Sequence, residues 1–105
     1  MIIVTTNDIP SKKIATVKGL VQGSTVKAKH VGRDIGASFK TLVGGEIKGY
    51  SDLMKEAREE ALGRMIKEAE SLGANAVIGM RYQTSQVMTA AAEVIAYGTA
   101  VVVEE

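Results

Sequence analysis

The chain has one strong helix pattern, and strand patterns stand on both sides of it. Residues 13–29 alternate and are rich in Val and Thr, as a half-buried strand is. The helix pattern covers residues 52–72, and residues 74–83 and 93–103 then predict two strands joined by a long hairpin. This order favours a right-handed crossover, with the last strand inserted between the first two and antiparallel to both.

The apolar side of the predicted helix is wider than one sheet requires. We place its N-cap at Ser51 and its C-terminal stop at Gly73. Its apolar residues spread over roughly 220° on a helical wheel, whereas a helix covering one sheet usually shows a stripe of about 100°. Arg58 lies inside this arc, so it needs a carboxylate or a bound anion if it is buried. We interpret it as part of a structural ion pair, and alternatively as an anion-binding residue at a subunit boundary.

The predicted sheet has two different faces. Gly19, Gly79 and Gly98 fall on a face of small residues, which would let the helix approach closely. The opposite face is expected to carry larger apolar residues: Ile14, Leu20, Ile78, Met80, Tyr82, Ile95, Tyr97, Val101 and Val103. Because a monomer rarely exposes an apolar patch of more than a few hundred Å², we expect a second copy of the chain to cover this face. Residues 2–5 are a short strand that the edge of a neighbouring copy could use.

The composition indicates one globular domain and supplies little for catalysis. The 105 residues are 46% hydrophobic and 24% charged, and no segment is apolar enough to predict a membrane span or a leader peptide, so we expect a cytoplasmic protein. The chain has no Cys, which excludes disulfides, thiolate metal sites and a cysteine nucleophile. The single histidine, His30, has no second imidazole or thiol with which to bind a metal. No nucleotide-binding, hydrolase or zinc-protease motif is present, so the sequence favours a non-enzymatic protein.

Two further patterns have simpler explanations than a binding site. Residues 1–40 carry seven Lys or Arg against two Asp, which could form a phosphate-contacting stripe. Because no aromatic or arginine cluster accompanies these residues, we interpret them as exposed strand lysines and do not expect nucleic-acid binding. Four methionines could suggest a soft metal site, but their positions favour core packing: Met54, Met65, Met80 and Met88.

The glycine-rich stretch "VGRDIGASFKTLVGGEIKGYSD", residues 31–52, is interpreted as the crossover connector. Residues 34–43 could form a short helix within it. Gly44 and Gly45 would allow a sharp chain reversal, and Tyr50 would anchor the start of the long helix. We expect this stretch to lie at a subunit boundary.

Three ordered motifs resemble a known family: "VGGEIKGY" at 43–50, "EAREEAL" at 56–62 and "LGANAVIGMRY" at 72–82, with "YGTAVVV" near the end. Over nearly the whole chain the sequence resembles the YbjQ-like family of uncharacterised bacterial proteins, which also carries the label "putative heavy-metal-binding". The resemblance implies an α+β fold: a single dodecin-like domain over residues 1–105, two layers in the order β-α-β-β, and a three-stranded antiparallel or mixed sheet with one long helix on one face. It also implies assembly into a ring-shaped homopentamer. The label implies a metal ion but identifies no ligand, and Glu46 stands where members of the family often have Arg.

We therefore predict a non-enzymatic homo-oligomer, with five subunits as the resemblance implies, that binds a small ligand or metal ion at subunit interfaces. Its candidate interface or pocket residues are Gly44, Gly45, Glu46, Tyr50 and Arg58. One alternative is an enzyme whose active site is assembled between subunits from Arg58, Glu46, Tyr50 or His30. Another is a nucleic-acid-binding module that uses the Lys-rich N-terminal third. The sequence does not identify the ligand or any cofactor.

Overall fold

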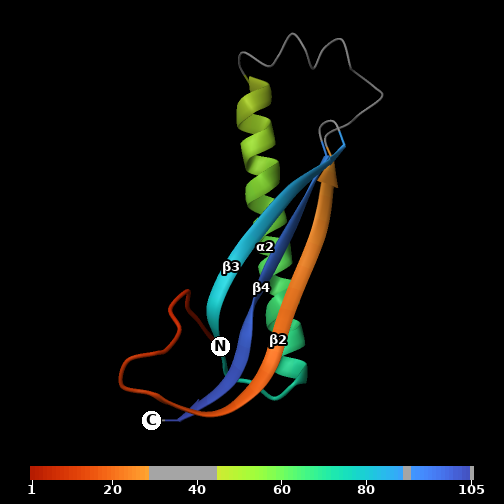
Figure 1. The fold of residues 1–105 in the computed structure, drawn as a ribbon. Coiled ribbons are helices and arrows are strands. Elements are labelled where there is room, and N and C mark those ends of the chain that lie inside the picture. Colours follow the sequence, from red (N-terminus) through yellow and green to blue (C-terminus); the bar gives the residue numbers. More distant parts are fainter. Residues whose placement is uncertain (29–44, 89–90, 105) are drawn as a thin grey trace.

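The computed structural model describes residues 1–28, 45–88 and 91–104 (Figure 1). They form one helix and four strands: β1 (Ile2–Ile3), β2 (Lys13–Ala28), α2 (Gly45–Ser71), β3 (Ala76–Met88) and β4 (Ala91–Glu104). The radius of gyration is 17.4 Å, against about 13 Å for a compact domain of this length. The chain is therefore unusually elongated, with extents of 56 × 22 × 16 Å.

The four strands form one mixed sheet in the order β1-β3-β4-β2. β4 lies between β3 and β2 and is antiparallel to both, as the sequence predicts. The predicted three-stranded sheet gains a fourth strand, because Ile2 and Ile3 pair in parallel with Ala76 and Val77 of the same chain. The idea that this N-terminal strand serves a neighbouring copy is therefore wrong for the structure described here.

The hairpin between β3 and β4 is longer in its strands than predicted. β3 continues to Met88 and β4 begins at Ala91, so most of the polar stretch assigned to a connection belongs to strands. Its Thr, Gln and Val residues suit an exposed strand as well as a loop, which is why composition alone placed the boundary too early.

The helix begins earlier than predicted and ends where predicted. Because α2 starts at Gly45, Ser51 is an exposed residue within the helix and not its N-cap, and Tyr50 lies within the helix as well. At the other end Gly73 adopts φ +79°. Its N–H donates to Glu70 O at 3.0 Å and that of Ala74 donates to Ala69 O at 3.1 Å. These two bonds form a Schellman motif, which glycine permits because it tolerates positive φ.

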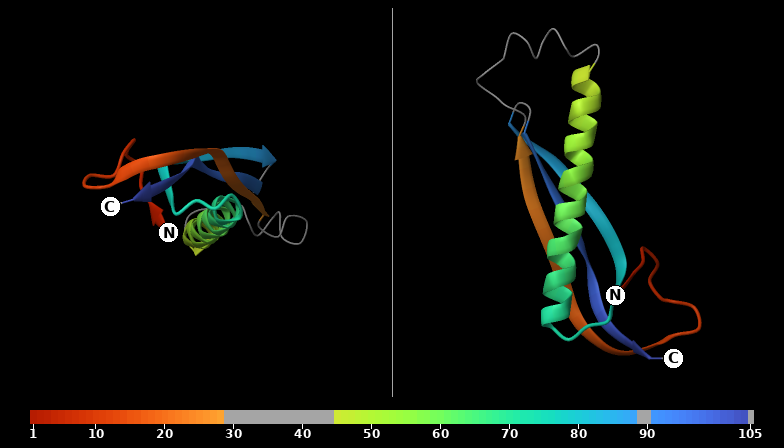
Figure 2. Two further views of the ribbon diagram at one scale, coloured as in Figure 1. Left: turned by 90° about the horizontal axis from the view of Figure 1, so that it is seen from below. Right: turned by 180° about the vertical axis from the view of Figure 1, so that it is seen from behind.

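The helix lies on one face of the sheet, over β2 and β4, and touches β3 in few places (Figure 2). Its fully buried side is a narrow row of Ala57, Ala61, Met65 and Ala69. Only part of the wide apolar arc is therefore buried within the chain. The main core joins this row to sheet residues of small or moderate size: Val21, Ala74, Val77, Met80, Val94, Ala96 and Ala100.

The opposite face of the sheet is less apolar than predicted. A second cluster buries Ala76, Val101 and Val103 there, and Ile9 of the N-terminal segment packs against it, so the chain covers part of this face itself. Met80 belongs to the main core instead. Tyr82 lies opposite Ala96, on the helix side, because a β-bulge between Ile78 and Arg81 reverses the alternation of β3.

Candidate functional site

The structure does not gather the predicted site residues into one pocket. Gly44 and His30 lie outside the described residues, as does the side chain of Glu46, while the backbone of Gly45 and Glu46 forms the first turn of α2. Tyr50 is half-buried on the next turn. Arg58 lies two turns further and is exposed, so the condition for a buried ion pair is not met. The proposed roles of these residues stay predictions.

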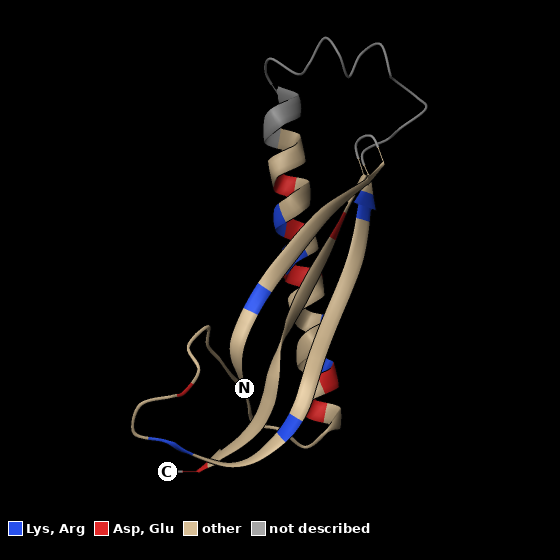
Figure 3. Cartoon of the chain, in the orientation of Figure 1, with Lys and Arg blue, Asp and Glu red and all other residues tan. Residues whose placement is uncertain are grey.

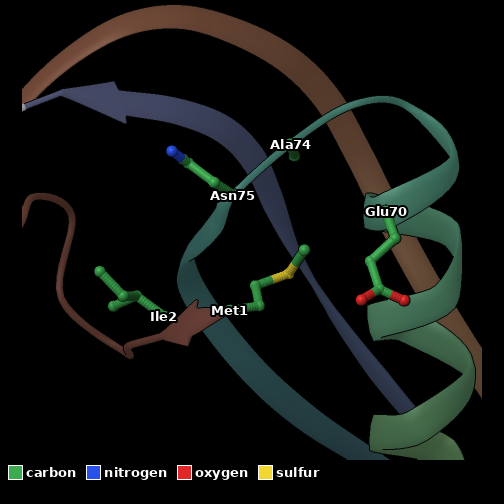
Figure 4. Close-up of a pocket in the computed structure, with 5 residues that line it drawn as sticks. All are labelled: Met1, Ile2, Glu70, Ala74 and Asn75. Carbon is green, nitrogen blue, oxygen red and sulfur yellow. The ribbon is translucent and has the colours of Figure 1, made fainter.

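The structure has an open depression at a different place, of about 410 Å³ (Figure 4). It is lined by Met1, Ile2, Glu70, Ala74 and Asn75. The Glu70 carboxylate extends from the helix beside the Met1 side chain, whereas the Asn75 amide turns away from both. The Asn75 amide is already engaged: its Nδ2 donates to Val103 O at 2.9 Å, and its Oδ1 accepts from Val103 N at 2.8 Å. Glu70 is therefore the one charged side chain among the residues that line this depression.

A charged network joins β2 to α2 along the opposite flank of the helix. Lys27 Nζ lies 2.5 Å from Glu60 Oε2 and 3.5 Å from Glu56 Oε1, and Arg64 NH2 lies 3.9 Å from Glu60 Oε1. The hydrogen bond from Lys27 is the main cause that lowers the pKa of Glu60, and the same bond raises the pKa of Lys27. Sequence reasoning missed the Lys27 contacts because Lys27 lies more than 25 residues before Glu56 and Glu60 and meets them only when the helix docks.

Two helix side chains also bind the outer edge of β2. Glu68 Oε1 accepts a hydrogen bond from the backbone N–H of Gln22 at 3.3 Å, and Arg64 NH1 donates to the backbone carbonyl of Ser24. Both backbone groups point away from β4. This flank is therefore built from charged side chains that serve the subunit's own structure.

The donor groups of the described residues do not fit a heavy-metal site within a single chain. Soft metals prefer thiolate or thioether ligands, and the sequence has no Cys. Of the methionines, Met65 is fully buried and Met80 is 6% exposed, both within the main core, which confirms the prediction of a packing role for these two. Among the residues that the structure describes, no three His, Asp or Glu side chains come together as a metal site would require.

The described lysines do not form a continuous basic stripe. Blue positions are spaced along β2 and interrupted by uncharged residues (Figure 3). Lys27 is held by two carboxylates of α2, which removes it from any such stripe. In the described part of the chain, no helix has the length and apolarity needed to cross a membrane.

These features define a class of protein: a small α+β domain whose described part has one long helix, a four-stranded mixed sheet and no clustered metal ligands. The sequence comparisons then give the family. A family model described as "Putative heavy-metal-binding" matches residues 1–104, and the chain belongs to this family, the YbjQ-like proteins. The resemblance noted from the motifs is thus confirmed.

Several bacterial relatives, all named UPF0145 proteins, match the full length of the chain. That of Halalkalibacterium halodurans is 63% identical over 105 residues, covering 100% of this chain and 99% of the relative. The relative in Clostridioides difficile is 60% identical, covering 100% and 94%, and that in Thermotoga maritima is 57% identical, covering 100% and 99%.

One solved structure has a similar fold. It is the crystal structure of a protein of unknown function from Pediococcus pentosaceus, assigned to the DUF74 family, with a TM-score of 0.63. The match covers 99% of this chain and 98% of that one at 20% sequence identity, so it supports the shared fold alone.

Proposed function

We propose that the chain is a non-enzymatic subunit that assembles with copies of itself and binds a small ligand or ion where the subunits meet. The observation that carries this proposal is an apolar row on β2. Val17, Leu20 and Val26 are 64%, 69% and 56% exposed, and they are the large hydrophobic residues that β2 leaves exposed. We call these three residues the β2 patch.

The β2 patch lies on one face of the sheet. Its members stand opposite Val101, Thr99 and Glu93, residues that alternate along β4 and so share the face turned away from the helix. Val101 belongs to the small cluster beneath the N-terminal segment, which leaves the β2 patch as its uncovered continuation. Moving one Leu or Val side chain out of water stabilises a protein by about 1.5–3 kcal/mol, so covering three of them is a substantial driving force for association.

The shape of the subunit supports the same proposal. A chain that is 56 Å long and 16 Å thick exposes more surface than a compact domain of its length, and association would bury part of it. The ring of five subunits implied by the family resemblance requires a head-to-tail contact, in which the β2 patch meets a different surface of the next copy.

Subunit junctions are also the best-supported position for a ligand. The depression beside Glu70 is open on one side, and a neighbouring subunit could close it. Its carboxylate would favour a metal cation or a ligand that carries an amine. The first turns of α2, with Gly45, Glu46 and Tyr50, remain the position predicted from the sequence.

Native mass spectrometry of protein purified without chelator or affinity metal tests both parts of the proposal. We expect an oligomer, and a ligand would appear as a fixed extra mass per subunit or per junction. Leu20→Lys should shift the oligomer towards monomer by placing a charge in the β2 patch. Gly63→Lys, which adds the same charge on an exposed part of α2 outside the predicted junction, should leave the oligomer mass unchanged. A monomeric wild-type protein would contradict the proposal.

A further inference from the structure

The two long edges of the sheet are not equivalent. A free edge strand offers unpaired N–H and C=O groups to any other strand, and proteins normally block such edges. On β2, Glu68 occupies the N–H of Gln22 and Arg64 occupies the carbonyl of Ser24. The middle of the β2 edge is therefore closed by the subunit's own helix.

The N-terminal part of the β3 edge, before Arg81, is also closed. Val4 donates to Val77 O and accepts from Met80 N, both at 3.0 Å, and Thr6 O accepts from Gly79 N at 2.8 Å. The N-terminal segment thus covers β3 up to its bulge. Arg81 fixes this cover by donating from NH1 to Thr5 O at 2.9 Å.

Beyond Arg81 the outer edge of β3 is open within the described structure. Gln22 and Ser24 direct their backbone groups away from β4. In an antiparallel pair this direction alternates along each strand, and two opposite residues either both point towards the partner strand or both point away from it. With the observed register, Tyr82, Thr84 and Gln86 therefore direct their backbone groups outward. The one contact found there is local, from the side-chain amide of Gln83 to Thr84 O at 3.3 Å.

This open edge lacks the residues that usually prevent strand pairing. Between Tyr82 and Met88 the sequence contains no Lys, Asp, Glu or Pro. Tyr82, Val87 and Met88 are 41%, 52% and 58% exposed, so apolar side chains accompany the free backbone groups. The edge is thus suited to accept a strand.

We propose that the β3 edge, residues 82–86, pairs antiparallel with the same edge of a second copy, across a two-fold axis at Thr84. Each outward residue then meets an outward residue of the partner: Thr84 faces its own copy and Tyr82 faces Gln86. Paired threonines are favourable across antiparallel strands, and no like charges meet. The copy's β3 is the partner, and not its β2, because Arg64 and Glu68 already occupy the middle of β2.

This inference rests on the proposed self-association but uses a surface other than the β2 patch. A ring and a two-fold contact can coexist, in which case rings join in pairs and the number of subunits is even. Failure of the edge contact therefore leaves the ring intact, and the two proposals can be separated by experiment.

Cysteine cross-linking tests the edge contact, because the natural chain contains no Cys. Directly opposite Cα atoms of a hydrogen-bonded antiparallel pair lie about 5.5 Å apart, which is within disulfide range. Thr84→Cys should therefore form a covalent dimer on mild oxidation, seen on a non-reducing gel. Ser24→Cys, on the closed β2 edge, is the matched control and should stay monomeric on that gel.

Each other result decides against the edge contact. If Thr84→Cys cross-links only when mixed with Ser24→Cys, then β2 is the partner strand and the inference is wrong. An oligomer with no Thr84 cross-link, or one with an odd number of subunits, keeps the proposed function and overturns this inference. A monomeric protein overturns both.

A second variant gives an independent measurement. Thr84→Pro removes an N–H that bonds to nothing inside the described subunit, so the far-UV circular dichroism should be preserved while the native mass falls by half. An unchanged mass in a folded Thr84→Pro protein would overturn the inference. If this variant does not fold, the cross-link decides.

Discussion

Gly23 of β2 lies so close beneath Ala61 of α2 that a β-carbon at position 23 would overlap the Ala61 carbonyl oxygen. The same β-carbon would also collide with the backbone nitrogen of Met65. Both obstacles belong to the helix backbone, which cannot rotate out of the way as a side chain can. Helix and strand therefore meet at backbone-to-backbone distance, and glycine at position 23 is the condition for that approach.

We expect Gly23→Ala to lower the free energy of unfolding by about 3 kcal/mol, the upper part of the range for overpacked cores, because the whole helix must shift to admit one methyl group. Urea unfolding followed by circular dichroism would measure the change. A loss below about 0.5 kcal/mol would show that the helix moves freely on the sheet, contrary to the structure.

Gly63→Ala is the matched control. Gly63 lies within α2 on its exposed side, and a β-carbon there would meet nothing within 4 Å. Alanine has the higher helix propensity, so this variant should raise the free energy of unfolding by about 0.5–1 kcal/mol. The same chemical change should thus have opposite effects at the two positions.

The ion pair between Lys27 and Glu60 should make stability depend on pH at both ends of the scale. The Lys27 hydrogen bond lowers the pKa of Glu60 below its ordinary 4.5, so this group stabilises the fold above pH 4.5 and the benefit is lost as the pH falls through the lowered value. The pKa of Lys27 is raised above 10.5, so its contribution is lost as the pH rises through that raised value.

Lys27→Met tests this linkage. It keeps the aliphatic stem but removes the charge, so the acid-side loss of stability between about pH 4.5 and pH 2 should become smaller than in the natural protein. The urea midpoints of both proteins, measured at pH 7 and at pH 3, each at low and high salt, would give the difference. Identical pH profiles for the two proteins would contradict the role given to the pair.

Asn75→Ala should destabilise the end of the sheet where β3 begins and β4 ends by about 2 kcal/mol. The side chain of Asn75 makes two hydrogen bonds with the backbone of Val103, which is 7% exposed, and alanine would leave both backbone groups unpaired. Amide hydrogen exchange gives a local readout: Val103 N–H should lose protection in the variant. Unchanged protection at Val103 would mean that water or another group replaces the amide.

Arg81→Ala should loosen the N-terminal segment without unfolding the subunit. Arg81 NH1 bonds to Thr5 O at 2.9 Å and Met80 O at 2.8 Å, and this position is exposed, so we expect a loss of about 1 kcal/mol or less. Limited proteolysis within residues 1–12 should become faster. Arg58→Ala, which removes an exposed arginine from α2, should leave the proteolysis rate unchanged.

The order of the main elements followed from the sequence because its signals are local. The Val-rich alternation of β2 and β4 and the C-terminal stop at Gly73 are visible in short windows, and all three are confirmed. The start of the helix was placed too late, since Gly45 and Gly49 disfavour a helix interior and yet lie inside α2. At these two positions the rest of the long helix overrides the low helix propensity of glycine.

The side chains of β3 that face the helix could not be predicted, because the hydrophobic alternation does not show where a bulge occurs. Gly79 adopts φ +61° at the bulge, and from that point Met80 and Tyr82 lie on the helix side. Strict alternation assigned both to the opposite face. The sequence also predicts that Gly79 allows the close approach of the helix, whereas in the structure Gly23 does so.

The candidate site depended on contacts between distant segments, which a single sequence does not reveal. The sequence places Lys27 in a basic run, but in the structure it faces α2 and binds Glu56 and Glu60. The helical wheel places Arg58 in an apolar arc, but its side chain is exposed in the structure because only a narrow row of that arc meets the sheet.

That narrow row has a consequence for how the protein tolerates change. Ala57, Ala61 and Ala69 have no rotatable side chains, so the helix docks on Gly23 and its neighbours without freezing any rotamer at these positions. A substitution there cannot be absorbed by a side chain that repacks. In a library of variants, the residues accepted at positions 23, 57 and 61 should therefore be ranked by volume far more than by polarity.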